Sequence, residues 1–273
     1  MIIGKKYELI CKIGNGAFGS IYKGKNIRTG ESVAIKMEQV DSQTKLLKNE
    51  TKVYQYLSNF NYPWISDLKY FGLCENTYYL VLNLLGPSLS KFKIKHTNIS
   101  LDIVLSIGIQ MLDRLKFLHN KGLIHRDIKP DNFLLGTGEN KNKLYLIDFG
   151  FCKKYINDDG KHMDTKMLNN IIGTPHFISL NVHNLIQPSR RDDIESIIYV
   201  LIYLWNSDFI TIKKRENIEI NPLDYLKNIK TNLINNDDLH NVFKLMLENV
   251  RKLGFEEEPD YNYLTNLCKE HIK

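Results

Sequence analysis

Charged and amide side chains gather in residues 124–150, which read IHRDIKPDNFLLGTGENKNKLYLIDFG. Asp127, Lys129 and Asn132 follow one another in a segment that contains a proline and is therefore unsuited to a regular helix or strand. The apolar run LYLI then predicts a buried strand that ends at Asp148. Polar groups this dense, bounded by strand-forming residues, indicate catalytic groups held on a rigid scaffold.

Two motifs in this stretch resemble those of protein kinases. Residues 125–132, HRDIKPDN, match the catalytic loop H-R-D-x-x-x-x-N, and residues 148–150, DFG, match the metal-binding turn. A lysine two residues after the aspartate, as at Lys129, is the serine/threonine form of that loop. The alternative is a solvated polar hairpin, which would need both motifs to arise by chance in the right order.

A glycine-rich stretch near the N-terminus is the third motif. Gly14, Gly16 and Gly19 form G-x-G-x-x-G, which alone is weak evidence because dinucleotide-binding folds also contain it and there it opens a helix. Here β-forming residues precede and follow the glycines, which predicts a strand, a loop and a second strand. The kinase resemblance implies that this hairpin, with Ile13 and Ile21 on its strands, covers the phosphates of ATP.

A lysine and a glutamate are expected to form an ion pair behind this hairpin. Lys36 ends the strand-forming run VAIK, where an unpaired buried ammonium would be costly. Residues 45–58 have apolar side chains at helical spacing, and Glu50 is the natural partner on that helix. An exposed lysine or glutamate without a role is the alternative for each residue alone. The resemblance implies that Lys36, fixed by Glu50, holds the α- and β-phosphates.

A second apolar run, residues 78–85 (YYLVLNLL), predicts another strand. The resemblance implies that it leads to the adenine site, with Leu82 as the gatekeeper and with Asn83 and Leu85 in the hinge. Ala34, on the strand that carries Lys36, is expected to line the same site.

The second half of the chain is predominantly helical in pattern. Ser100 and Gly122 predict the two ends of a helix over residues 101–121, and residues 194–205 predict a core helix with Asp193 at its N-terminal end. Further helices are expected at residues 222–230, 237–252 and 261–271. We therefore expect an α+β protein kinase fold in one domain, residues 1–273. Its small, mainly β lobe should span about residues 1–84, and its larger, mainly α lobe about residues 85–273.

Composition narrows the class of protein and of partner. The formal net charge of +6 suits an acidic or phosphate-bearing partner, although a solvated basic surface would give the same value. Four scattered cysteines without a C-x-x-C pair predict a reducing compartment, the cytoplasm or the nucleus. The first residues lack the pattern of a signal peptide, and the longest apolar run is too short to span a bilayer. We expect no membrane partner, no specific nucleic acid and a monomer.

Several further stretches resemble the casein kinase 1 family more closely than kinases at large. They are residues 84–89 (LLGPSL), 129–134 (KPDNFL), 189–196 (SRRDDIES) and 255–261 (FEEEPDY), with SLN at residues 179–181 where other kinases have Ala-Pro-Glu. The resemblance extends from about residue 7 to about residue 269. It implies that the substrates are acidic or phosphate-primed proteins.

One departure bears on substrate choice. The family's activation segment usually reads Gly-Thr-Ala-Arg, and its arginine receives the substrate's anion, whereas here residues 173–176 read GTPH. His176 is mostly neutral near pH 7, so we expect a weaker anion site. Arg190, Arg191 and the nearby Lys213 or Lys214 are candidates to compensate.

The resemblance implies serine/threonine phosphorylation with ATP and Mg²⁺. Asp127 would accept the proton of the substrate hydroxyl, Lys129 would neutralise the transferring phosphoryl group, and Asn132 and Asp148 would hold Mg²⁺. Two alternatives remain: a pseudokinase that binds nucleotide without catalysis, and an interaction scaffold that uses the basic surface.

Overall fold

The computed structural model describes residues 1–16, 19–42, 45–211 and 221–273, which form two compact units. The first unit comprises Met1–Pro87 and Leu134–Cys152, and the second comprises Ser88–Phe133 and Lys153–Lys273. About 42% of the described residues are in helices and about 22% are in strands, and the strands concentrate in the first unit. The predicted α+β class, with a β-sheet lobe and a helical lobe, is confirmed.

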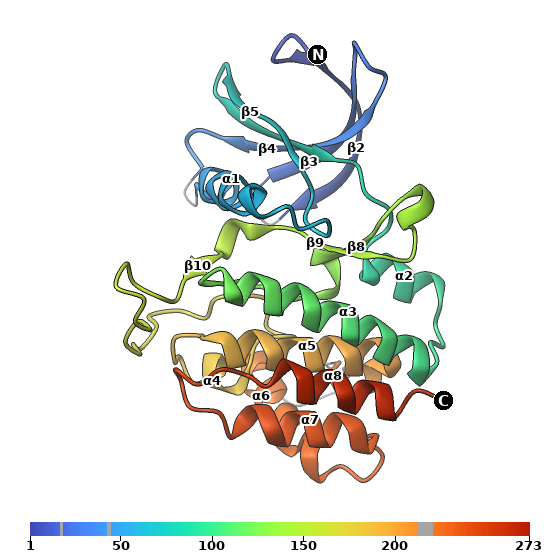
Figure 1. The fold of residues 1–273 in the computed structure, drawn as a ribbon, viewed down its shortest axis with the longest axis vertical. Coiled ribbons are helices and arrows are strands. Elements are labelled where there is room, and N and C mark those ends of the chain that lie inside the picture. The colour runs from blue at the N-terminus through green and yellow to red at the C-terminus, as the bar shows by residue number, and fades with distance from the viewer. Residues whose placement is uncertain (17–18, 43–44, 212–220) are drawn as a thin grey trace. The chain divides into compact units, whose positions relative to one another are not determined.

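A six-stranded antiparallel sheet forms most of the first unit (Figure 1). Its spatial order is β1-β2-β3-β4-β6-β5. The strands are β1 (Ile2–Ile3), β2 (Tyr7–Gly16), β3 (Gly19–Asn26), β4 (Ser32–Gln39), β5 (Leu68–Cys74) and β6 (Thr77–Asn83). Alternate residues such as Val33 and Ile35 on β4 point to one buried core, which they share with Tyr79 and Val81 on β6. This period of two fixes which side chains of β4 face the other way, and Ala34 and Lys36 are among them.

Helix α1 (Leu46–Leu57) belongs to the same unit and confirms the helix expected over residues 45–58. The Glu38 carboxylate on β4 accepts hydrogen bonds from the backbone N–H groups of Leu46, at 3.0 Å, and Leu47, at 3.1 Å. These are two of the N–H groups that a helix start leaves without intrahelical partners. Glu38 therefore fastens the start of α1 to the strand that carries Lys36.

A shorter chain segment completes the first unit. Strands β8 (Phe133–Leu135) and β9 (Leu144–Leu146) pair in a two-stranded sheet, and β9 leads to Asp148. The backbone N–H of Gly86 donates to Leu135 O at 2.8 Å, and that of Leu135 donates to Pro87 O at 2.9 Å. These bonds join the segment after β6 to β8.

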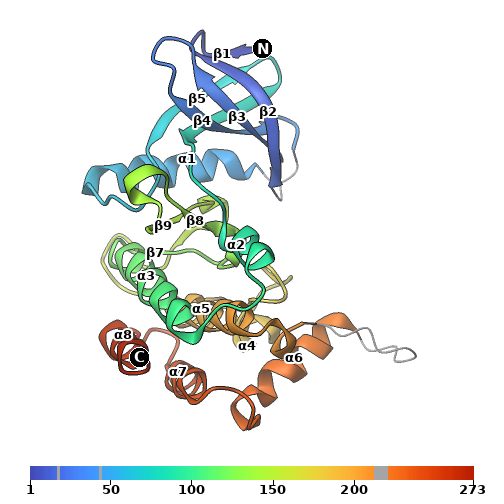
Figure 2. The same ribbon diagram turned by 90° about the vertical axis from the view of Figure 1, so that its right-hand side faces the viewer.

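The second unit is built from helices around α5 (Figure 2). Its helices are α2 (Leu89–Lys95), α3 (Leu101–Asn120), α4 (Leu180–His183), α5 (Arg190–Trp205), α6 (Pro222–Asn232), α7 (Asn241–Arg251) and α8 (Tyr261–Glu270), and strands β7 (Leu123–Ile124) and β10 (Lys153–Lys154) pair beside them. Helices α3 and α5 lie side by side, and α8 packs on α3. As predicted, Ser100 caps the start of α3, and Gly122, with φ 74°, follows its end.

Helix α5 begins at Arg190, four residues before the predicted start at residue 194. The reason is a capping box in which Ser189 and the Asp192 carboxylate satisfy each other's backbone N–H groups. The helix is so deeply buried that Ile197, Ile198 and Leu201 have no exposed surface. Across the described residues, no helix is both long enough and apolar enough to cross a membrane.

Candidate active site

Lys36 lies at the centre of a charged cluster in the first unit. Strand β4 carries it between Ile21 of β3 and Leu80 of β6, its cross-strand partners. Its Nζ donates to Glu50 Oε2 on α1 at 2.6 Å and to Asp148 Oδ1 at 2.8 Å. The structure thus brings together three of the site residues that the sequence predicts, and the expected pairing of Lys36 with Glu50 is present.

Electrostatics in this cluster follow from one ammonium facing two carboxylates. Burial by itself would lower the pKa of Lys36, but the charges of Glu50 and Asp148 outweigh it and hold this pKa above its usual value. Burial raises the pKa of Glu50 to about 7, against the opposing effect of Lys36. When all three groups are ionised, negative charge is in excess, which favours binding of a cation.

The turn that carries Asp148 is held by α1. Asp148 adopts the left-handed conformation, with φ 65°, which is uncommon outside glycine and typical of functional sites. The ring of the next residue, Phe149, packs edge-on against Tyr54 with the ring centroids 4.9 Å apart. Asn49 Nδ2 donates to Gly150 O at 2.9 Å. Movement of α1 would therefore move Asp148 together with Glu50.

The glycine-rich hairpin has the predicted strand–loop–strand form. Gly16 pairs with Gly19 at the end of β2 and β3, and Gly14 pairs with Ile21. Ala17 and Phe18 at its tip lie outside the described residues. A Cβ added at Gly19 would come 1.8 Å from Met37 O, so this position needs glycine for the contact between β3 and β4. At Gly14 the same Cβ would meet nothing within 4 Å.

The residues expected around adenine lie on the same sheet. Ala34 on β4 pairs with the buried Leu82 on β6. The next residue, Asn83, ends β6, and its Nδ2 donates to Asp67 Oδ2 at 3.0 Å. Ile13 lies on β2 and is partly exposed, and Leu85 follows β6. Ile13, Ala34, Leu82 and Asn83 therefore lie on strands of one sheet in the first unit, and Leu85 lies just beyond the end of β6.

A second polar cluster surrounds Asp127 in the second unit. Asp127 Oδ2 accepts from Lys129 Nζ at 2.6 Å, and Oδ1 accepts from Thr174 Oγ1 at 2.8 Å. Asn132 Nδ2 donates to Asp127 O at 2.8 Å, which orients the amide of Asn132. Asp127 and Asn132 are buried. The structure brings together the three predicted residues of this loop and adds Thr174, which the sequence motifs did not identify.

Asp193 on α5 braces this loop. Its carboxylate accepts from the backbone N–H groups of His125, at 2.7 Å, and Arg126, at 2.9 Å. The buried His119 ring lies 3.0 Å from the same carboxylate and 2.6 Å from the Tyr261 hydroxyl. Burial would raise the pKa of Asp193, but its contacts with His119 and the loop hold it below its usual value. The bracing matters because Arg126, immediately before Asp127, has a φ of 68° and needs external support.

Each cluster, taken by itself, contains donor atoms of the types that a magnesium nucleotide binds. Asp148 and Asn132 supply carboxylate and amide oxygen atoms, which hard cations such as Mg²⁺ prefer. Lys36 and Lys129 supply ammonium groups suited to phosphate oxygens. The donor types in each cluster therefore suit ATP and Mg²⁺.

Comparison with known protein families agrees with this chemistry. The family model described as "Protein kinase domain" matches residues 7–255. The match covers most of both units and includes every candidate catalytic residue; helix α8 lies beyond its end.

Proposed function

Because the chain belongs to the protein kinase family, we propose that it transfers the γ-phosphoryl group of ATP to serine or threonine side chains of acidic proteins. The two units then act together as one kinase domain over residues 1–273. The observation that carries the proposal is the arrangement around Asp127, where Lys129 and Thr174 each bind one carboxylate oxygen. That arrangement suits a base held in one orientation toward a hydroxyl group.

Each residue has a separate task in this reaction. Asp127 orients the substrate hydroxyl and accepts its proton, and Lys129 neutralises charge on the transferring phosphoryl group. Lys36, held by Glu50, positions the α- and β-phosphates. Asn132 and Asp148 hold Mg²⁺, which when bound neutralises charge on the phosphates. No covalent enzyme intermediate is needed, because positioning and electrostatics suffice for such a transfer.

Contacts between two of the sequence signatures favour a casein kinase 1-type enzyme. Arg190, from residues 189–196, donates through Nη2 to Glu256 O at 2.6 Å and lies 3.4 Å from the Glu258 carboxylate, both from residues 255–261. Residues 179–181 (SLN) also contact the stretch 189–196. Ser179 Oγ and Asn181 Nδ2 donate to Asp192 Oδ1 at 2.6 and 3.0 Å. The resemblance therefore rests on stretches that depend on one another in the fold.

Positive charge near the catalytic loop supports acidic substrates. The pKa of Lys153 is lowered first by burial and then by the charges of Arg126 and Lys166, so three cations lie near one another. Such a group favours an anion, because each cation repels the others. Lys213 and Lys214, which were candidates to help, lie outside the described residues. We further propose a monomer in a reducing compartment, cytoplasmic or nuclear, consistent with four free cysteines.

The test is incubation of the purified protein with γ-labelled ATP, Mg²⁺ and casein as an acidic acceptor. We expect label on phosphoserine and phosphothreonine, with none on phosphotyrosine. Thermal stabilisation by nucleotide without transfer would indicate a pseudokinase. Absence of both transfer and nucleotide-dependent stabilisation would favour an interaction scaffold.

A further inference from the structure

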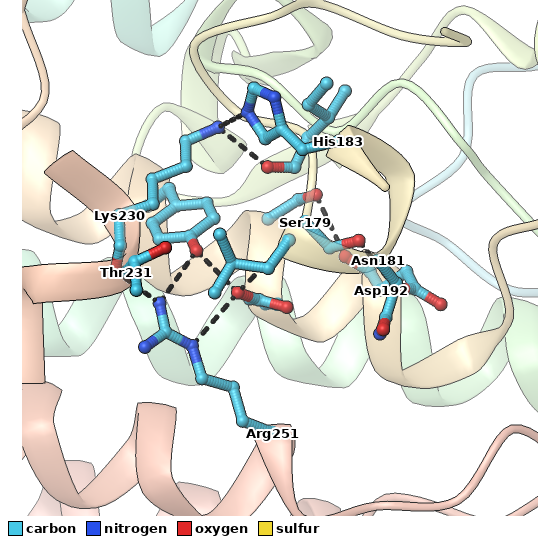
Figure 3. Close-up of polar contacts among 12 residues, drawn as sticks. Ser179, Asn181, His183, Asp192, Lys230, Thr231 and Arg251 are labelled. Atoms are coloured by element: carbon cyan, nitrogen blue, oxygen red, sulfur yellow. Dashed lines mark hydrogen bonds and ion pairs between the residues drawn. The ribbon is translucent and has the colours of Figure 1, made fainter. Parts of the chain in front are cut away.

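A fully buried lysine on α6, Lys230, points toward His183 of a distant segment (Figure 3). Lys230 Nζ donates to Pro175 O at 2.9 Å and to Ile178 O at 2.7 Å. It also lies 3.1 Å from His183 Nε2 on α4. The kinase motifs do not include this lysine, and no step of the proposed mechanism uses it.

The segment that Lys230 binds is continuous with the catalytic cluster. Pro175 directly follows Thr174, which donates to Asp127. Ile178 directly precedes Ser179, which caps α4 and donates to Asp192 on α5. Residues 174–179 are therefore fastened at three places: by Thr174 at the front, by Lys230 along the main chain and by Ser179 at the end.

Burial of the Lys230 ammonium group is costly unless polar partners surround Nζ. Burying an ammonium group costs far more than burying an apolar side chain of similar volume. Nζ lies 4.7 Å from the centroid of the Tyr199 ring. The nearby Glu195 is paired with Arg251 at 3.2 Å, and Arg251 also donates to Lys230 O at 2.8 Å. The direct hydrogen-bond partners of Nζ are thus the two carbonyl groups and His183, all three within residues 175–183.

The two carbonyl bonds survive a change of protonation. Burial and the charge of Lys230 lower the pKa of His183 to about 3, so this imidazole is neutral near pH 7. Burial lowers the pKa of Lys230 itself to about 7. The ammonium form has three N–H donors for its three partners. The neutral amine keeps two N–H donors for the carbonyl groups, and its lone pair can accept from His183 in the other tautomer.

We propose that Lys230 is a positioning residue for the protein substrate, because it holds residues 174–178 in the conformation that places Thr174 against Asp127. This role rests on the proposed function. The held segment also carries His176, the position at which we expect the substrate's anion to be received. Lys230 thereby controls how well the acceptor peptide is bound, while Lys36 and its partners in the first unit hold the nucleotide independently of it.

The direct test is Lys230→Met, with Lys227→Met on the same helix as the matched control. Lys227 carries a similar charge near His183, but it does not donate to the carbonyl groups. We expect Lys230→Met to raise the peptide KM and to lower kcat on the same peptide, which together reduce kcat/KM roughly ten- to a hundredfold, because misplacement of a positioning segment can have an effect of that size. The KM for ATP should stay within about twofold, and Lys227→Met should match the unmodified protein.

Hydrogen exchange gives a second readout that does not depend on activity. The backbone N–H groups of Phe177 and Ile178 donate to Thr174 O at 2.8 and 3.1 Å, so their exchange reports opening of the segment. We expect faster exchange at these amides in Lys230→Met and unchanged exchange in α3. If the methionine variant does not fold, Lys230→Gln, whose shorter amide cannot reach as far, serves in both measurements.

The outcomes separate the two proposals. Transfer by the unmodified protein, with peptide KM and exchange both unchanged in the folded variant, overturns the role of Lys230 alone. Absence of transfer by the unmodified protein overturns the proposed function and this role toward substrate with it. A raised peptide KM with faster exchange at Phe177 and Ile178 supports both.

Discussion

Thr174 Oγ1 donates to Asp127 Oδ1 at 2.8 Å, across 47 positions of the chain. Lys129 Nζ binds the other oxygen, Oδ2, at 2.6 Å. The carboxylate is therefore held from both sides, and its plane is fixed by two residues from different segments. A base that is oriented in advance needs less reorganisation when it accepts a proton.

The first prediction concerns the hydroxyl of Thr174. Thr174→Val keeps the shape but removes the donor to Asp127, so we expect turnover to fall on the order of tenfold or more. Thr174→Ser keeps the donor and should retain most of the activity. The measurement is kcat on one acidic peptide for the three proteins, and equal activity of the valine and serine variants would show that the hydrogen bond does not matter.

The second prediction concerns Glu50 and the direction of its pH dependence. The pKa of Glu50 is raised to about 7 in the folded protein, so the stability that its protonated form contributes is present at low pH and lost as pH rises through about 7. Glu50→Gln cannot ionise and does not suffer this loss. We expect the Tm of the glutamine variant, relative to the unmodified protein, to increase from pH 5 to pH 8.

The catalytic activity of Glu50→Gln, in contrast to its relative Tm, should be lower than that of the unmodified protein at pH 8. The neutral amide binds Lys36 more weakly than a carboxylate does, so we expect phosphoryl transfer to fall about tenfold or more at pH 8. Thermal melts and rates measured in the same buffers test both halves. A variant that is less stable than the unmodified protein by the same amount at every pH would contradict the raised pKa.

Periodicity and capping residues were enough to predict several elements of this fold. The helix expected over residues 101–121 is α3, Leu101–Asn120, because Ser100 and Gly122 mark its ends. The start of α5 was predicted too late, since the apolar pattern begins at residue 194 while the cap uses Ser189. Strand β5, Leu68–Cys74, was not predicted, because it is a half-buried edge strand without a continuous apolar run.

The site residues also fall into two groups, those that sequence patterns could predict and those that they could not. Residues within spaced motifs, such as Asp127 and Asp148, could be found because their chemistry recurs at fixed spacing. Thr174 and Lys230 could not, because their partners lie 47 to 55 positions away and local patterns carry no information on such contacts. Lys230 lies on an amphipathic helix rich in polar residues, and on such a helix a lysine is ordinarily expected to lie at the surface.

The third prediction concerns His176 and phosphate-primed substrates. Burial and then the charge of Lys230 lower the pKa of His176, so the imidazole is neutral near pH 7 and offers no full charge to an anion. We expect a small preference for phosphate-primed peptides, and a larger one in His176→Arg, whose guanidinium stays charged. Rates on matched primed and unprimed peptides at several pH values provide the measurement. A strong preference in the unmodified protein that the substitution leaves unchanged would contradict the role of this position.

The proposed mechanism of phosphoryl transfer is tested most directly with two variants, Asp127→Asn and Asp148→Asn. The measurement is the rate at which each phosphorylates an acidic peptide with a single serine. Each variant removes one carboxylate, either the proposed proton acceptor or the proposed metal ligand, and keeps a side chain of nearly the same shape. We expect each variant to lose on the order of a hundredfold or more in turnover, with a Tm that shows an intact fold. Near-normal turnover of either purified variant would contradict the proposed mechanism.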